Sequence, residues 1–92
     1  MVFRTHNIRR SGNKLVADED SNIAISNTRS KFIHWVLYQD GLPKLIGHGS
    51  DGTASKLLSF KGRDLKGSYT LKVRAYTSRG MEIKLDTLLD IV

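Results

Sequence analysis

A strict alternation of residue types over residues 67–80, GSYTLKVRAYTSRG, constrains the fold of this chain more than any other feature. In an extended strand, successive side chains point to opposite faces. One face here consists of Tyr69, Leu71, Val73 and Ala75. The other consists of Thr70, Lys72, Arg74 and Tyr76. We therefore expect a long strand over residues 68–77 with one face in the core and the other in water.

The same period of two dominates the rest of the chain, and no apolar i, i+3, i+4, i+7 pattern persists over a helix-length window. Strands are predicted at residues 14–17, 22–26, 31–39, 44–46, 55–60, 68–77 and 81–85, with 88–92 as an extension of the last. Residues 53–58 are also compatible with a turn and a half of helix. Short strands at turn spacings of about 8 to 12 residues predict an all-β antiparallel sandwich of about seven strands.

The length of 92 residues suits one domain. We assign residues 13–92 to the sandwich. Residues 1–12 form either a basic N-terminal arm or a first edge strand, and a frayed end is expected. Asp40-Gly41 predicts a hairpin, with a turn lengthened by Leu42-Pro43, and residues 47–52 predict a loop.

Composition excludes several classes of function. Without cysteine, the chain has no disulfide, thiolate metal site or cysteine nucleophile. No apolar run approaches the roughly 18 residues that cross a bilayer, and the N-terminus lacks the apolar core of a secretory signal. The net charge of +6 favours polyanionic partners, although a solubilising surface is the equal alternative because the basic residues are spread along the chain.

Two aromatic residues are predicted to be structural. Trp35 alternates inward on the strand 31–39, which turns His34 and Val36 outward. Tyr69 follows a glycine turn at the start of the penultimate strand, and this placement resembles the tyrosine corner of immunoglobulin-like sandwiches. The resemblance implies a hydrogen bond from the Tyr69 hydroxyl to the backbone near residues 63–66.

Residues 67–80 resemble the closing hairpin of bacterial immunoglobulin-like modules of the polycystic-kidney-disease and triple-tyrosine types. Residues 32–50, FIHWVLYQDGLPKLIGHGS, are similar to their middle hairpin. The resemblance covers about residues 13 to 86, without the cysteine pair of antibody domains. It implies an accessory part of an exported, cell-surface or polysaccharide-handling protein, acting as a spacer, docking unit or glycan binder. The compartment itself is not determined by the sequence.

Motifs of nucleotide and metal binding are incomplete. Residues 47–52 match G-x-G-x-x-G but lack the strand–helix context of a dinucleotide site. Asp18, Asp20 and Asn22 have the spacing of a calcium loop, but Ile23 and Arg29 stand where glycine and glutamate are needed. A solvated acidic turn is therefore the preferred interpretation.

Catalytic arrangements are also missing from the sequence. His6, His34 and His48 are far apart along the chain, and no Gly-x-Ser-x-Gly elbow occurs. Glu19, Asp40, Asp51 and Asp64 fall in predicted turns, where carboxylates cap and are solvated. We therefore expect no enzyme activity, no cofactor and no metal.

The outward face of the predicted closing sheet interleaves aromatic residues with cations, which suits stacking on sugars and pairing with anions. Its candidate ligand-binding residues are His34, Tyr38, Lys72, Arg74, Tyr76 and Lys84. An ordinary solvated face with cross-strand pairs is the preferred alternative. Arg4, Arg9 and Arg10 are a second candidate for phosphate contacts.

Three functions follow in order of preference. The first is a non-catalytic interaction module that docks another protein domain, and the second is a binding domain for an acidic polysaccharide. The third, nucleic-acid binding, rests on the pI alone, because no known recognition motif accompanies it, and a nucleic-acid partner is not expected.

Overall fold

The computed structural model describes residues 2–26, 30–50, 55–80 and 82–92, which contain nine strands and no helix. The strands are β1 (Val2–His6), β2 (Arg9–Ser11), β3 (Lys14–Ala17), β4 (Asn22–Ser26), β5 (Ser30–Gln39), β6 (Leu42–Ser50), β7 (Ser55–Ser59), β8 (Gly67–Thr77) and β9 (Glu82–Ile91). The all-β class predicted from the alternation is confirmed.

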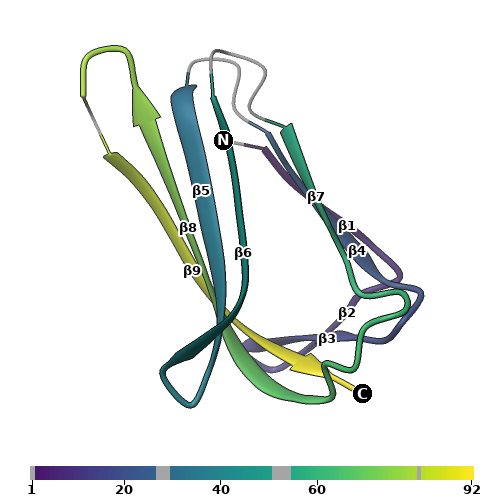
Figure 1. The fold of residues 1–92 in the computed structure, drawn as a ribbon. Helices are drawn as coiled ribbons and strands as arrows, with labels where there is room; N and C mark the ends of the chain where they lie inside the picture. The colour runs from purple at the N-terminus through teal and green to yellow at the C-terminus, as the bar shows by residue number, and fades with distance from the viewer. Residues whose placement is uncertain (1, 27–29, 51–54, 81) are drawn as a thin grey trace.

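The strands form two sheets that pack face to face as a sandwich (Figure 1). The smaller sheet has the order β1-β4-β7, and the larger has the order β2-β3-β9-β8-β5-β6. All neighbouring strands run antiparallel except β3 and β9, which pair in parallel. This pair departs from the predicted antiparallel arrangement. A parallel pair joins segments that are far apart along the chain, so no hairpin in the sequence could indicate it.

Residues 2–11 supply the two strands beyond the predicted seven. β1 pairs with β4 as an edge strand of the smaller sheet, and β2 pairs with β3. The N-terminal basic residues therefore lie in strands, in line with the edge-strand alternative and against a frayed arm. Residues 55–59 form β7, so the helical alternative is wrong there, while residues 53 and 54 lie outside the described part of the chain.

The β5–β6 hairpin is tighter than predicted. Gln39 pairs with Leu42, so Asp40 and Gly41 alone form the turn, with φ angles of 52° and 78°. This is the geometry of a two-residue turn with positive φ at both positions, for which Asp-Gly is a preferred sequence. Leu42 and Pro43 already belong to β6, and the strand continues to Ser50 instead of giving way to a loop at Gly47.

Pro43 is tolerated in β6 because this strand lies at the edge of the larger sheet. Tyr38 pairs with Pro43 and Leu37 with Leu45, which leaves Lys44 as an extra residue on the edge strand. Such a bulge bends and twists the strand.

The core lies between the two sheets and follows the predicted alternation. In β8 the burial pattern alternates from Tyr69 to Ala75, which confirms the predicted face. The inward residues of β5 are Ile33, Trp35 and Leu37, and the opposite sheet contributes Ile23, Ile25 and Leu58. Burying these side chains is the main source of stability in such a domain.

Trp35 is 6% exposed and lies over the backbone of Gly47 on the neighbouring strand. A Cβ atom at position 47 would overlap the indole ring at Cε2. The indole Nε1 is buried without a hydrogen-bond partner among the described atoms, so the ring acts through packing. The glycine is therefore required by the tryptophan, and not by a loop.

Tyr69 is 4% exposed and packs in the core at the start of β8. No hydrogen bond joins its hydroxyl to the backbone of residues 63–66, all of which the structure describes. The hydrogen bond implied by the tyrosine-corner resemblance is absent, and Tyr69 stabilises the domain through its ring. Burial, together with the negative charge of Asp64, raises the pKa of the Tyr69 phenol.

We expect Gly47→Ala to lower the free energy of unfolding by about 1 to 3 kcal/mol, because the methyl group would displace the indole ring. Urea unfolding measures the change. In a Trp35→Phe background the same substitution should cost less, since the smaller ring leaves room for the methyl group. Equal costs in the two backgrounds would contradict the contact.

Tyr69→Phe tests the buried phenol through pH. The folded pKa lies above the ordinary value of 10.0, so the unfolded chain releases this proton first. Wild-type stability should therefore fall as the pH rises above about 10, and the Phe variant should lose less over the same range. Urea unfolding at about pH 8 and about pH 11 measures both slopes, with Tyr76→Phe as the control that keeps the wild-type loss.

Candidate functional site

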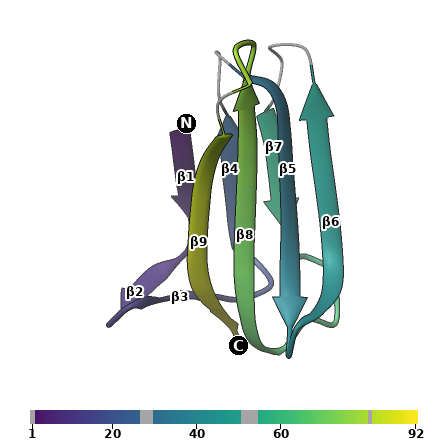
Figure 2. The same ribbon diagram turned by 90° about the vertical axis from the view of Figure 1, so that its left-hand side faces the viewer.

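The six candidate ligand-binding residues lie on one surface, the outer face of the larger sheet. Figure 2 shows this face toward the viewer, with β9, β8, β5 and β6 side by side. The strand registers place Phe32 beside Tyr76, His34 beside Arg74, and Val36 beside Lys72. Every second residue of β5 points to the same face, and each residue of β8 points to the same face as the β5 residue it pairs with. The side chains of these pairs therefore lie together on the outer face.

Four rings gather at one end of this face and form what we term the aromatic cluster: Phe32, His34, His48 and Tyr76. The Phe32 ring stacks near both histidines, with centroid distances of 6.2 Å to His34 and 6.1 Å to His48. Tyr76 lies 6.4 Å from Phe32 in a tilted arrangement and is 38% exposed. The cluster therefore presents ring faces and edges at the surface.

Two members of the aromatic cluster were not among the predicted site residues. Phe32 has the same parity as His34 and Tyr38, so the alternation of β5 alone would have found it. His48 was assigned to a loop, and only the pairing of β6 with β5 places it opposite His34.

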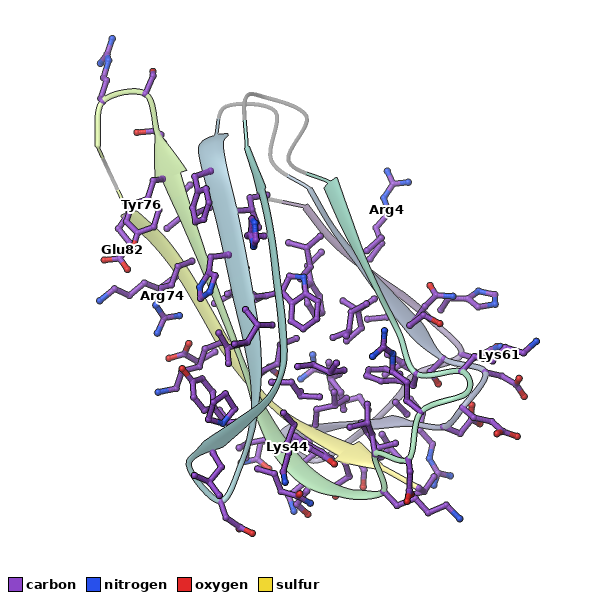
Figure 3. The ribbon with its side chains drawn as sticks, viewed as in Figure 1. Arg4, Lys44, Lys61, Arg74, Tyr76 and Glu82 are labelled. Carbon is purple, nitrogen blue, oxygen red and sulfur yellow. The ribbon has the colours of Figure 1, made fainter. Side chains whose placement is uncertain are left out.

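Beside the aromatic cluster lies a network of charges on β8 and β9. Arg74 donates from Nη1 to Oδ1 of Asp86 at 2.6 Å and from Nη2 to Oδ2 at 3.4 Å. Its Nε lies 3.6 Å from Glu82, which also lies 3.7 Å from the ammonium group of Lys84. Figure 3 shows Arg74 and Glu82 together with Tyr76 on the side of the sheet that faces away from the core.

These contacts shift the pKa values of both Arg74 and Asp86. The hydrogen bond to Asp86 raises the pKa of Arg74 above its ordinary value, and the same bond lowers the pKa of the Asp86 carboxyl. Arg74 is therefore a cation that already holds two carboxylates. It is not an unpaired charge that waits for an anionic ligand.

Lys72 differs from Arg74 in its surroundings. Its ammonium group lies 5.5 Å from the centroid of the Tyr38 ring, within the range of a cation–π contact. No carboxylate of the described residues lies within ion-pair distance of it. Lys72 is thus the cation of this face with the most freedom to meet an anion.

Val36 sits on the same face but is only 5% exposed. Its cross-strand neighbours are Ile46 and Lys72, and Ile46 is 60% exposed. The face therefore contains an apolar strip between the aromatic cluster and the Tyr38–Lys72 pair.

Other basic residues lie elsewhere on the molecule. Figure 3 shows Arg4 and Lys61 on the opposite side of the sandwich from Arg74, while Lys44 lies near the β5–β6 hairpin. Among the described side chains, the positive charge is therefore dispersed over several sides of the sandwich.

The predicted acidic turn is held by hydrogen bonds between its own residues. The Asp18 carboxylate accepts hydrogen bonds from the backbone N–H of Asp20 at 2.8 Å and from the Ser21 hydroxyl at 3.3 Å. Across the described ranges, no group of three or more histidine or acidic side chains is placed to hold a metal ion. These residues also include no helix long and apolar enough to cross a membrane.

No model of a protein family matches this chain, and comparisons with curated protein sequences and with solved structures find no match either.

The Arg74–Asp86 pair should give stability that depends on pH. The folded pKa of Asp86 lies below its ordinary value of 3.8, so the pair stabilises the protein above that pH and stops doing so as the pH falls through the folded pKa. Urea unfolding should show Asp86→Asn less stable than wild type near neutral pH, with the difference vanishing at about pH 2. A constant difference would contradict the ion pair.

Proposed function

We propose that this chain is a non-catalytic interaction module that binds a polysaccharide through the outer face of its larger sheet. The aromatic cluster carries the proposal. A sugar ring has an apolar face that packs against aromatic side chains and hydroxyl groups that hydrogen-bond to charged side chains. The cluster supplies ring surfaces, and the adjoining Arg74, Glu82 and Lys84 supply donors and acceptors.

The module type is proposed from the sequence resemblance to bacterial immunoglobulin-like accessory domains. The all-β sandwich supports this type at the level of architecture. An accessory role, as a glycan binder or docking unit beside another domain, agrees with a broad sheet face that offers contacts without a catalytic arrangement.

An acidic polysaccharide is the second candidate ligand, and Lys72 is the observation that favours it. Its ammonium group is exposed at the Tyr38 ring and can meet a carboxylate or sulfate. The charges of the face as a whole nearly cancel, because it carries the cations Lys72, Arg74 and Lys84 and the anions Glu82 and Asp86. Binding through this face should therefore depend less steeply on salt than the net charge of the chain suggests.

Affinity gel electrophoresis against neutral and sulfated polysaccharides tests the proposal. Tyr76→Ala should weaken binding about fivefold or more, since a stacking contact is worth roughly 1 kcal/mol or more. For the neutral polysaccharide, Tyr38→Ala is the matched control, because it removes the same residue type from the same face outside the aromatic cluster and away from the ring contacts that carry the proposal. Equal effects of the two substitutions would contradict a site at the cluster.

Lys72→Glu separates the two ligand classes. Binding to heparin should fall strongly in this variant if the ligand is acidic, and binding to a neutral glucan should persist if the aromatic cluster is sufficient. Retention of the wild type on single-stranded DNA but on no polysaccharide would overturn the proposal in favour of nucleic-acid binding.

A further inference from the structure

The strand β9 has a free backbone edge over half of its length. β8 pairs with β9 from Glu82 to Ile91, but β3 covers the other side only from Leu88 to Ile91. Among the described strands, none pairs with residues 82–87 on that side. Figure 2 shows this part of β9 at the margin of its layer, with β1 behind it in the opposite layer.

The inner face of this segment is incompletely covered. Ile83 and Leu85 pair with Ala75 and Val73, which are fully buried, yet both are only half-buried themselves. Phe3 on β1 is also only partly buried against the core. One more strand beside β9 would lie over β1 and complete this side of the sandwich.

The sequence of the segment is complementary to itself in one antiparallel register. With a twofold axis at Leu85, Leu85 meets its own copy, Ile83 meets Thr87, and Lys84 meets Asp86 twice. If the second strand slid along the first by one residue, side chains of the inner face would lie opposite side chains of the outer face. Moving the twofold axis to residue 84 would put Lys84 opposite its own copy, and moving it to residue 86 would put Asp86 opposite its own copy. Like charges directly opposite each other are destabilising.

The length of the free edge fits the same register, whose pairs cover residues 83–87. A hollow of about 440 Å³ lies at the end of the free segment, between residues 85–88 and the β2–β3 hairpin, whose Arg10 and Asn13 line it. In this register the last pair joins Thr87 to Ile83 of the second copy, and β3 occupies the same edge from Leu88 onward, so the pairing ends there.

We propose that two copies of this chain associate through residues 83–87 of β9, which pair antiparallel and join the two larger sheets into one. The occupant of the edge is a second copy because this sequence itself supplies both partners of the Lys84–Asp86 pairs. The outer faces of the two copies then lie side by side. A polymeric ligand could contact both, which raises its apparent affinity without any new contact. The association itself does not depend on the proposed ligand.

The interface is small, so we expect a weak dimer with a dissociation constant of about 10 µM to 1 mM. Sedimentation equilibrium at about 0.15 M salt, where the net charge is screened beyond roughly 8 Å, should show the apparent mass rising with concentration. A monomer at every concentration up to the millimolar range would overturn the proposal.

Charge exchange tests the register. Lys84→Glu alone and Asp86→Lys alone should each be monomeric, because like charges then face each other. An equimolar mixture of the two should dimerise as well as the wild type or better, since each contact again joins opposite charges. Lys61→Glu is the matched control, with the same charge change on the opposite side of the sandwich, and it should dimerise as the wild type does. Dimers that persist in both single variants would place the interface elsewhere.

A measurement on the wild type alone keeps the test independent of variant folding, because Asp86→Lys also breaks the Arg74 pair. Amide hydrogen exchange followed by NMR at low and high protein concentration should show slower exchange at the outward-pointing amides of residues 83–87 as the dimer forms. Protection that rises on β6 or β1 instead, or nowhere, would overturn the proposal.

Discussion

The packing of the Trp35 ring over Gly47 sets the register on which the outer face depends. Trp35 is the largest inward side chain of β5, and only a glycine opposite it leaves room for the ring. With Trp35 inward, the residues of even number on β5 must point outward, which places Phe32 and His34 on the surface. A shift of one residue would bury His34 and expose the indole. The core contact and the surface site are therefore two consequences of one register.

The sequence predicted what short-range alternation determines and missed what long-range pairing determines. The outward faces of β5 and β8 follow from period two, and the six candidate residues, Lys84 of β9 among them, were brought to one side by expecting these three strands to be neighbours. β1 and β2 were anticipated only as one alternative, a first edge strand in place of a basic arm, because a strand of three to five residues gains its stability from its neighbour, and β1 finds its neighbour in β4. The glycines of β6 were assigned to a loop, since glycine favours turns unless a side chain such as Trp35 packs on it.

The charge of the candidate site shows why composition predicts partners poorly. The excess of six positive charges suggests a polyanion, yet Arg74 is neutralised locally by Asp86 and Glu82. Asp86 was not anticipated, although its register position is simple. It lies on β9 opposite Lys72, next to the pair of Arg74 and Lys84, and a long arginine side chain reaches this diagonal neighbour. Local pairing, and not net charge, decides which cations of this face are available to a ligand.

The free edge of β9 and the outer face share two residues, Lys84 and Asp86. Each takes part in ion pairs with the face, and each also stands at the edge where another strand would contact it. Charges at a strand edge discourage pairing with unrelated strands, because few sequences offer the opposite charges in the same order. A strand that does match draws Asp86 away from Arg74 and so leaves Arg74 with more of its positive charge exposed. If the proposed acidic ligand binds at this face, its binding and occupation of the edge are coupled, and by thermodynamic linkage each favours the other to the same extent, although neither requires the other.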